Sequence, residues 1–167
     1  MNSSKGEMDR KMHKIIVVGE GGVGKTSFIR RHTTGEFKPQ YVATNGMETT
    51  PYPEKEIYPF VFWDCAGQKQ FEGLREGYYI GADAAILMFD VTFTSTYKNL
   101  EKRYRDIRRV CGNIPIVLVG NKTDMKQQCK IWSHAVDFHG LQYYPISSKS
   151  NSNFELPLKY LLKKLNP

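Results

Sequence analysis

The sequence predicts an α/β fold in which a mostly parallel central sheet carries helices on both faces. Short apolar runs alternate along the chain with segments of helical periodicity, and this alternation is typical of a parallel sheet. Residues 84–89 form a continuous apolar run, as expected of a strand that is buried on both faces. A glycine-rich segment, residues 19–26, joins the first apolar run to the first helical pattern and fits a phosphate-binding loop.

The individual elements follow from these runs in chain order. Each apolar run is short enough for a strand, and each intervening segment places apolar residues at helical spacing. The expected order is a strand at residues 15–18, a helix from about Thr26, strands at 60–64 and 84–89, a helix over 97–111, a strand at 116–119, a helix around 132–138, a short strand at 143–146 and a last helix from about Asn153.

Residues 49–59 are less regular than the rest of the chain. Pro51, Pro53 and Pro59 have no N–H to donate to a neighbouring strand, so this segment should form an edge hairpin. No internal repeat or linker interrupts the pattern. We therefore expect one domain over residues 13–167, preceded by a disordered tail over residues 1–12.

The composition favours an ordinary globular protein without a membrane anchor. The chain has 167 residues, no apolar stretch as long as a membrane span and no secretory signal. Asn2 excludes N-myristoylation, and no prenylation cysteine stands at the end. The three cysteines and four histidines lack metal-ligand spacing, and we expect the cysteines to be reduced thiols.

The net charge of +7 admits an acidic partner, a nucleic acid or an anionic membrane surface. The densest basic segment, residues 102–109, should have Tyr104, Ile107 and Val110 on its buried side, and helical spacing spreads its cations around more than one face to form a basic surface. This face is either simply solvated or a docking site for an acidic protein. The aromatic interleaving of nucleic-acid-binding surfaces is missing, and we expect no nucleic-acid or membrane partner.

The phosphate-binding loop has the pattern G-x-x-x-x-G-K-[ST] at every fixed position. Its glycines allow successive N–H groups to point at an anionic phosphate, and the following helix adds the positive end of its dipole. The Lys25 amine can reach the β- and γ-phosphates, and the Thr26 hydroxyl can ligate Mg²⁺. The expected nucleotide contacts from this segment are Glu20, Gly21, Gly22, Val23, Gly24, Lys25, Thr26 and Ser27.

Three further motifs follow later strands, at the edge where ligands bind in such sheets. After the strand at 60–64, Asp64 can hold Mg²⁺ through water and the Gly67 N–H can meet a γ-phosphate. Asn121, Lys122 and Asp124 follow the strand at 116–119. A carboxylate at Asp124 can accept from guanine N1–H and its 2-amine, which adenine lacks, so guanine should be preferred by about 10⁴ or more. Ser147, Ser148 and Lys149 complete the set, with the Ser148 N–H toward guanine O6 and the Lys149 stem over the base.

With these four motifs in order, the chain resembles the small Ras-like GTPases, which have a P-loop NTPase fold, and within them the Ran family of nuclear-transport GTPases. The resemblance covers residues 14–165. The Ran-like stretches are residues 31–32, 34–37, 41–44, 73–80, 88–92, 96–99, 113–118 and 141–144.

The resemblance implies further roles. Thr44 corresponds to the switch I threonine that closes on Mg²⁺ and the γ-phosphate, and Gln68 to the glutamine that orients the attacking water, with Tyr41 beside it. Phe37, Lys38, Tyr41 and Thr44 are implied nucleotide contacts, and Phe71 is the aromatic that the GDP form offers to its import carrier. Catalysis would rest on Gln68, Lys25, Thr44 and Gly67, and Mg²⁺ on Thr26, Thr44 and Asp64.

Several residues depart from the Ran pattern. Pro39, Asn45 and the pair Lys69-Gln70 alter segments that would contact partners, whereas Cys65 replaces a threonine of similar size. Ran proteins continue into a linker, a helix and an acidic tail beyond the position of Pro167. This chain is either cut before that tail or lacks it.

The resemblance implies a monomeric GTP/GDP switch with Mg²⁺ that hydrolyses GTP slowly, in the nucleus and cytoplasm. Its implied partners are importin-β-type transport receptors, an exchange factor, a GTPase-activating protein and the GDP-form import carrier. Two alternatives stay open: a Rab- or Ras-like membrane-traffic GTPase whose lipidated tail is missing, and a pseudo-GTPase that serves as a binding module.

Overall fold

A six-stranded sheet forms the centre of the molecule in its computed structural model, which describes residues 11–38, 46–65, 75–125, 131 and 136–167. The strands lie in the order β2-β3-β1-β4-β5-β6. Only β2 runs antiparallel to its neighbour, β3, and the other pairs are parallel. The strand bounds are β1 His13–Val18, β2 Met47–Pro51, β3 Phe60–Cys65, β4 Ala84–Asp90, β5 Ile116–Asn121 and β6 Gln142–Pro145.

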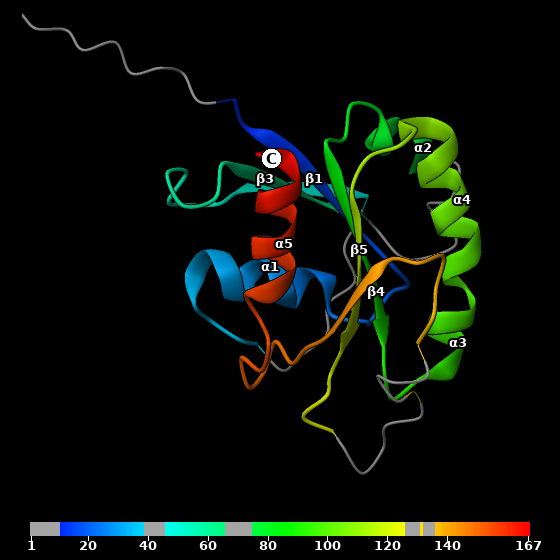
Figure 1. Cartoon of the computed structure of the whole chain (residues 1–167). Coiled ribbons are helices and arrows are strands. Elements are labelled where there is room, and N and C mark those ends of the chain that lie inside the picture. Colours follow the sequence, from blue (N-terminus) through cyan, green and yellow to red (C-terminus); the bar gives the residue numbers. More distant parts are fainter. Residues whose placement is uncertain (1–10, 39–45, 66–74, 126–130, 132–135) are drawn as a thin grey trace, which may run out of the picture.

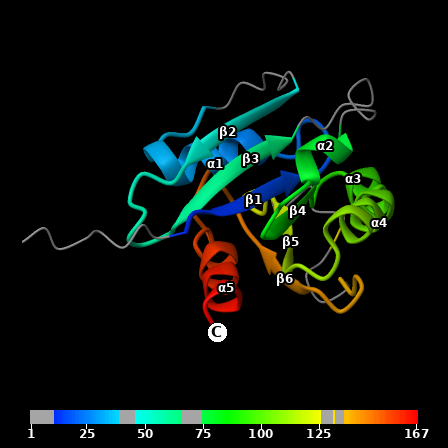
Figure 2. The same cartoon turned by 90° about the horizontal axis from the view of Figure 1, so that it is seen from above.

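Helices cover both faces of this sheet (Figures 1 and 2). On one face lie α1 (Lys25–Thr34) and α5 (Leu156–Leu165), and on the other α2 (Arg75–Tyr79), α3 (Thr94–Lys98) and α4 (Leu100–Cys111). The predicted α/β fold with a mostly parallel sheet is therefore confirmed. None of the described helices is long and apolar enough to cross a bilayer.

Strand β1 shows why the sheet needs helices on both sides. Successive side chains of a strand point to opposite faces. Ile15 and Val17 belong to the core beneath α1 and α5, and Ile16 and Val18 belong to the core beneath α2 and α4. All four are fully buried. Every residue of β4 is likewise buried, as its continuous apolar run predicts.

The proline-rich segment confirms the expectation of an edge hairpin. Strand β2 ends at Pro51 and occupies one edge of the sheet, paired only with β3. Pro53 and Pro59 lie outside both strands, in the connection between them. The prolines therefore lie at positions where the sheet needs no N–H donor for a hydrogen bond between strands.

The helix predicted over residues 97–111 is divided into α3 and α4. Asn99 separates them with φ −83° and ψ 0°, and its side-chain amide donates to the Glu20 carboxylate in the glycine-rich loop. This contact from another part of the chain could not be read from helical spacing. Within α4 the buried residues are Leu100, Arg103 and Ile107. The expected burial is confirmed for Ile107, whereas Tyr104 and Val110 are half-buried.

Two other predicted helices differ from the structure. Val136, Asp137 and Phe138 are not helical, so the helix expected around residues 132–138 is wrong in its described part. The last helix begins at Leu156, three residues after the expected start, because Asn153 has a positive φ of 54°. The Asn153 amide donates to the Pro145 carbonyl at 3.0 Å, which fixes that turn. Strand β6 begins and ends one residue before the expected range.

His32 on α1 is held as a neutral imidazole between aromatic rings. It stacks on Phe154 with ring centroids 3.6 Å apart and meets Phe28 edge-on. Its Nε2 lies 3.1 Å from the Phe154 carbonyl oxygen, which accepts only if that nitrogen carries the proton. Burial lowers the pKa of His32 to about 3, and the carbonyl hydrogen bond offsets part of this effect.

We predict that acid destabilises the fold through His32. The imidazole of the unfolded chain binds a proton below about pH 6.5, whereas that of the folded protein binds one only below about pH 3. The free energy of unfolding should therefore fall by about 1.4 kcal/mol for each unit of decrease in pH across that interval. His32→Gln should remove this contribution, whereas His139→Gln, at an exposed histidine, should keep it. Urea unfolding at pH 6 and pH 4.5 measures the difference, and parallel pH dependence of wild type and His32→Gln would contradict it.

Candidate guanine-nucleotide site

The functional side chains gather at the carboxyl edge of the parallel strands. Because β1, β3, β4, β5 and β6 run in the same direction, their ends bring loops from distant parts of the chain to one edge. The glycine-rich loop follows β1, Asp64 lies at the end of β3, Asn121 ends β5, and Ser147 follows β6. The site is therefore assembled by the sheet rather than by any one segment.

The glycine-rich loop is shaped by close approaches to neighbouring strands. Gly24 caps α1 with φ 106°, in the left-handed region that favours glycine. A Cβ on Gly24 would overlap the Asn121 amide nitrogen, and one on Gly19 would overlap the carbonyl oxygen of Met88 in β4. These two positions therefore need glycine so that the loop can lie against β4 and β5.

Lys25 at the start of α1 is a buried cation bound to the loop itself. Its Nζ donates to the carbonyl oxygens of Gly19 at 2.9 Å and Glu20 at 2.7 Å, and the residue is only 6% exposed. Burial lowers the pKa of Lys25 to about 8, although the nearby Asp64 carboxylate favours the charged form and Arg103 opposes it. An anionic phosphate would supply the counter-charge that two carbonyls only approximate.

Two of the three residues proposed to hold Mg²⁺, Thr26 and Asp64, meet in the structure. The Thr26 hydroxyl donates to Asp64 Oδ2 at 2.5 Å, and Asp64 is 3% exposed. Hydroxyl and carboxylate oxygens suit Mg²⁺, which takes few protein ligands and completes its shell with water and phosphate oxygens. Accordingly, no cluster of three or more His, Cys, Asp or Glu in the described part of the chain could hold a metal alone. When bound, Mg²⁺ would neutralise phosphate charge.

Asn121 ties the base-side loops to the phosphate loop. Its buried amide nitrogen donates to the Val23 carbonyl at 3.1 Å, and its amide oxygen accepts from the Ser148 N–H at 3.2 Å. Three loops are thus joined through one side chain. The Ser148 N–H predicted to meet guanine O6 is engaged by Asn121, so a base would share it.

Lys122 makes the second link between these loops. Its Nζ donates to the Gly22 carbonyl at 2.7 Å and pairs with Asp90 Oδ2 at 3.0 Å. The Lys122 backbone has φ 73°, which is uncommon for a residue with a side chain and costs about 1–3 kcal/mol. The two side-chain contacts hold it in this conformation.

Asp124 stands at the exposed mouth of the site. Its Oδ1 accepts from the Ser147 hydroxyl at 2.7 Å, and the Ser147 oxygen in turn accepts from the Ser150 N–H at 3.0 Å. This chain orients the carboxylate while the side chain stays open to solvent.

Three residues of the described site belong to none of the four sequence motifs and were not predicted from the sequence. Asp90, which is 8% exposed, accepts from the Thr92 N–H at 2.8 Å and holds Lys122. Asn99 binds Glu20 from the break between α3 and α4, and Arg103 places a buried positive charge near Lys25. Asp90 directly ends a buried strand at the ligand edge, and that placement is the sequence signal that would have found it.

For the other residues predicted to bind the nucleotide, the structure gives the exposure or nothing at all. Phe37 is half-buried and Lys38 exposed in the loop after α1, and Lys149 is exposed beyond β6; their roles stay predictions. The following lie outside the described residues: Tyr41, Thr44, Gly67, Gln68 and Phe71.

A family model described as the Ras family matches residues 14–166. The chain belongs to the Ras family. Ras-family proteins are small GTPase switches, and they typically bind GTP or GDP with Mg²⁺. The match includes all four motifs and every strand residue except His13, in agreement with the site assembled above.

We predict that nucleotide binding to this Ras-family site takes up protons near pH 8. Lys25, with its pKa near 8, is about half neutral there, and a bound phosphate should restore its charge. Uptake should be about half a proton at pH 8 and about a tenth at pH 7. Calorimetry of GDP binding in buffers of different ionisation enthalpy measures it, and zero uptake at pH 8 would contradict the assignment.

Proposed function

We propose that the protein is a guanine-specific switch that hydrolyses GTP and acts as a Ran-type regulator of nuclear transport. The observation that carries guanine specificity is the Ser147–Asp124 contact, joined to the phosphate loop through Asn121. Ser147 orients the Asp124 carboxylate through one of its oxygens. The carboxylate can then accept hydrogen bonds from guanine N1–H and from the guanine 2-amine. Adenine offers neither donor, and it would leave the carboxylate without partners.

Hydrolysis would depend on positioning and electrostatics. Lys25, Mg²⁺ and the loop N–H groups would counter charge on the phosphates, and Gln68 is proposed to orient the attacking water. No arginine is evident in the sequence as a finger for the γ-phosphate, so we expect slow turnover alone and acceleration by a GTPase-activating protein. An exchange factor would reload GTP.

The Ran-type role is supported by the sequence stretches that resemble the Ran family, from residues 31–32 to 141–144. The GTP form would bind an importin-β-type receptor, and the GDP form its import carrier, in the nucleus and cytoplasm. We propose that the protein acts as a monomer with no nucleic-acid or membrane partner. The switch would be the ordering of Thr44 by the γ-phosphate.

The structure reduces the role expected of the basic helix. Arg105 pairs with Glu101 at 3.1 Å, and Arg109 pairs with Glu76 and with Asp106. Arg108 donates to the Ile114 carbonyl at 2.7 Å. The acidic side chains beside these cations lower the net positive charge of the α4 surface, so its steering of an acidic receptor should be modest.

The two alternatives differ in measurable ways. A membrane-traffic GTPase would carry a lipidated cysteine at the end of its full-length chain. A pseudo-GTPase would bind nucleotide without turnover, although Lys25, Thr26, Thr44 and Gln68 are all present. Single-turnover release of phosphate from bound GTP separates an active enzyme from the pseudo-GTPase.

We predict that Asp124→Asn exchanges guanine for xanthine preference. The asparagine amide can donate to the xanthine 2-oxygen. Toward the guanine 2-amine, however, it would place one hydrogen-bond donor against another. GDP affinity should fall by about 10²-fold or more while xanthosine diphosphate binding improves. Displacement of a fluorescent GDP analogue measures both, with Asp137→Asn, at an exposed aspartate, as the unchanged control. Equal displacement of that analogue by GDP and ADP from the wild-type protein would count against guanine selectivity.

We also predict that receptor binding follows the nucleotide. An importin-β-type receptor should bind the protein loaded with a non-hydrolysable GTP analogue more than tenfold better than the GDP form, a difference above about 1.4 kcal/mol. Titrations at low and moderate salt measure this difference and its electrostatic share. A smaller difference would favour the membrane-traffic or pseudo-GTPase alternative.

A further inference from the structure

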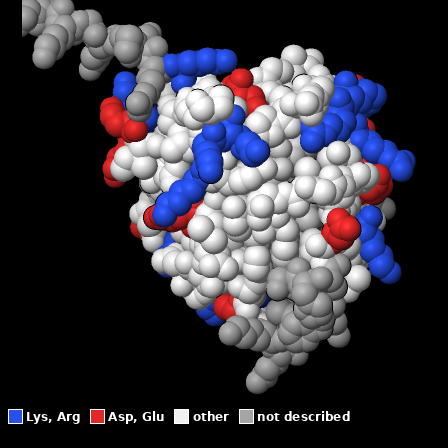
Figure 3. Space-filling model, viewed as in Figure 1, with Lys and Arg blue, Asp and Glu red and all other residues white. Residues whose placement is uncertain are grey.

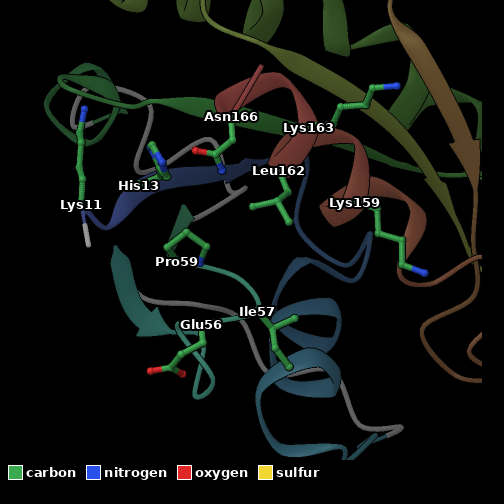
Figure 4. A pocket seen from close by; sticks show the side chains of 9 residues that line it. All are labelled: Lys11, His13, Glu56, Ile57, Pro59, Lys159, Leu162, Lys163 and Asn166. Carbon is green, nitrogen blue, oxygen red and sulfur yellow. The ribbon is translucent and has the colours of Figure 1, made fainter. Parts of the chain in front are cut away.

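A groove lies at the end of the molecule away from the nucleotide site. Its cavity of about 800 Å³ is bounded by the start of β1, the connection between β2 and β3, and α5 (Figure 4). His13 lines it at the first residue of β1, whereas the phosphate loop follows the last residue of the same strand. The two sites are therefore separated by about the length of β1, roughly 17 Å at the usual rise per residue.

The groove offers an apolar surface on two opposing walls. Ile57, in the connection between β2 and β3, is 49% exposed although it is a large aliphatic residue. Leu162 on α5 extends toward the cavity from the other side (Figure 4). The buried Pro59 adjoins them. An aliphatic side chain entering between Ile57 and Leu162 would remove apolar surface of both residues from water.

Lysines surround this apolar surface. Lys11, Lys159 and Lys163 line the groove, against a single acidic residue, Glu56. Figure 3 shows basic side chains gathered over α5. The groove therefore combines an apolar centre with a positive rim.

The rim lysines are available for exchange with an incoming carboxylate. Lys11 pairs with Asp83 at 3.6 Å and Lys159 with Glu155 at 3.3 Å. The lysine side chains are 74% and 62% exposed in these pairs. Ion pairs of exposed side chains contribute about 0–1 kcal/mol, so an incoming carboxylate can take the place of Glu155 at little cost. Asp83 is 24% exposed, and it keeps the hydrogen bond from the Lys14 N–H at 2.8 Å when Lys11 turns to another carboxylate.

We propose that this groove binds an acidic peptide segment of a partner protein, with an aliphatic side chain between Ile57 and Leu162 and carboxylates on Lys11, Lys159 and Lys163. The concave shape, walled by the hairpin connection and α5, fits a chain rather than a flat bilayer. Because the groove contains none of the nucleotide-binding residues, the partner would bind the GDP and GTP forms alike. Such a partner could hold the switch in place throughout its cycle.

The test uses a fluorescent peptide of Glu and Asp residues with two central leucines, followed by anisotropy. Lys159→Glu with Lys163→Glu should weaken binding by about tenfold or more, and Ile57→Ser by a smaller factor. The matched control, Lys98→Glu with Lys102→Glu on α3 and α4, makes the same change in net charge elsewhere and should weaken binding much less. Unchanged GDP affinity would show that each variant is folded.

Binding should weaken when serine replaces the peptide leucines and when salt is raised, and should be equal for protein loaded with GDP and with a GTP analogue. The proposal is overturned if the wild type does not bind the peptide, or if both double variants lose affinity equally. It is also overturned if vesicles of phosphatidylserine and phosphatidylcholine, but not the peptide, bind in a way that depends on Lys159 and Lys163.

Discussion

The site depends on the two hydrogen bonds that attach the end of β5 and the residue after it to the phosphate loop. Asn121 binds the Val23 carbonyl, and Lys122 binds the Gly22 carbonyl. A buried hydrogen bond contributes about 1 kcal/mol, but leaving one partner unsatisfied costs about 1–3 kcal/mol. The loop that would hold phosphates and the loop that would read the base therefore keep one relative position. Gly24 is part of the same constraint, since a side chain there would displace the Asn121 amide.

Pairs of opposite charge stabilise the same arrangement of loops. Two lysines, Lys25 and Lys122, are held at the ligand edge, and each has a buried carboxylate nearby: Asp64 for the first and Asp90 for the second. Their remaining donors point to backbone carbonyls of the glycine-rich loop. The protein thus keeps positive charge in a shielded place where a phosphate is a better partner than a carbonyl. The opposite end of β1 carries a second basic surface, and the sheet keeps the two apart.

Predictions from the sequence failed where a distant contact decided the local conformation. Asn99 interrupts a helical pattern and binds Glu20, seventy-nine residues earlier in the chain. Asn153 delays α5 by adopting a positive φ while its amide binds the Pro145 carbonyl. Arg103 stands at the buried position of a helix that otherwise obeys its apolar spacing. Helical periodicity reflects only residues that are near one another along the chain, so it cannot predict contacts with distant partners.

The sequence by itself determined the α/β class, the parallel order implied by alternation, and the residue types of the four motifs. These depend on local periodicity and on spacing within short segments, which the chain carries wherever it folds. Only the tertiary structure decided which side chains meet: Asp90 with Lys122, Ser147 with Asp124, and Thr26 with Asp64. It also formed the groove between Ile57 and Leu162. Those pairings depend on strand order and register, and residues from separate strands meet only after the sheet has brought their ends to one edge.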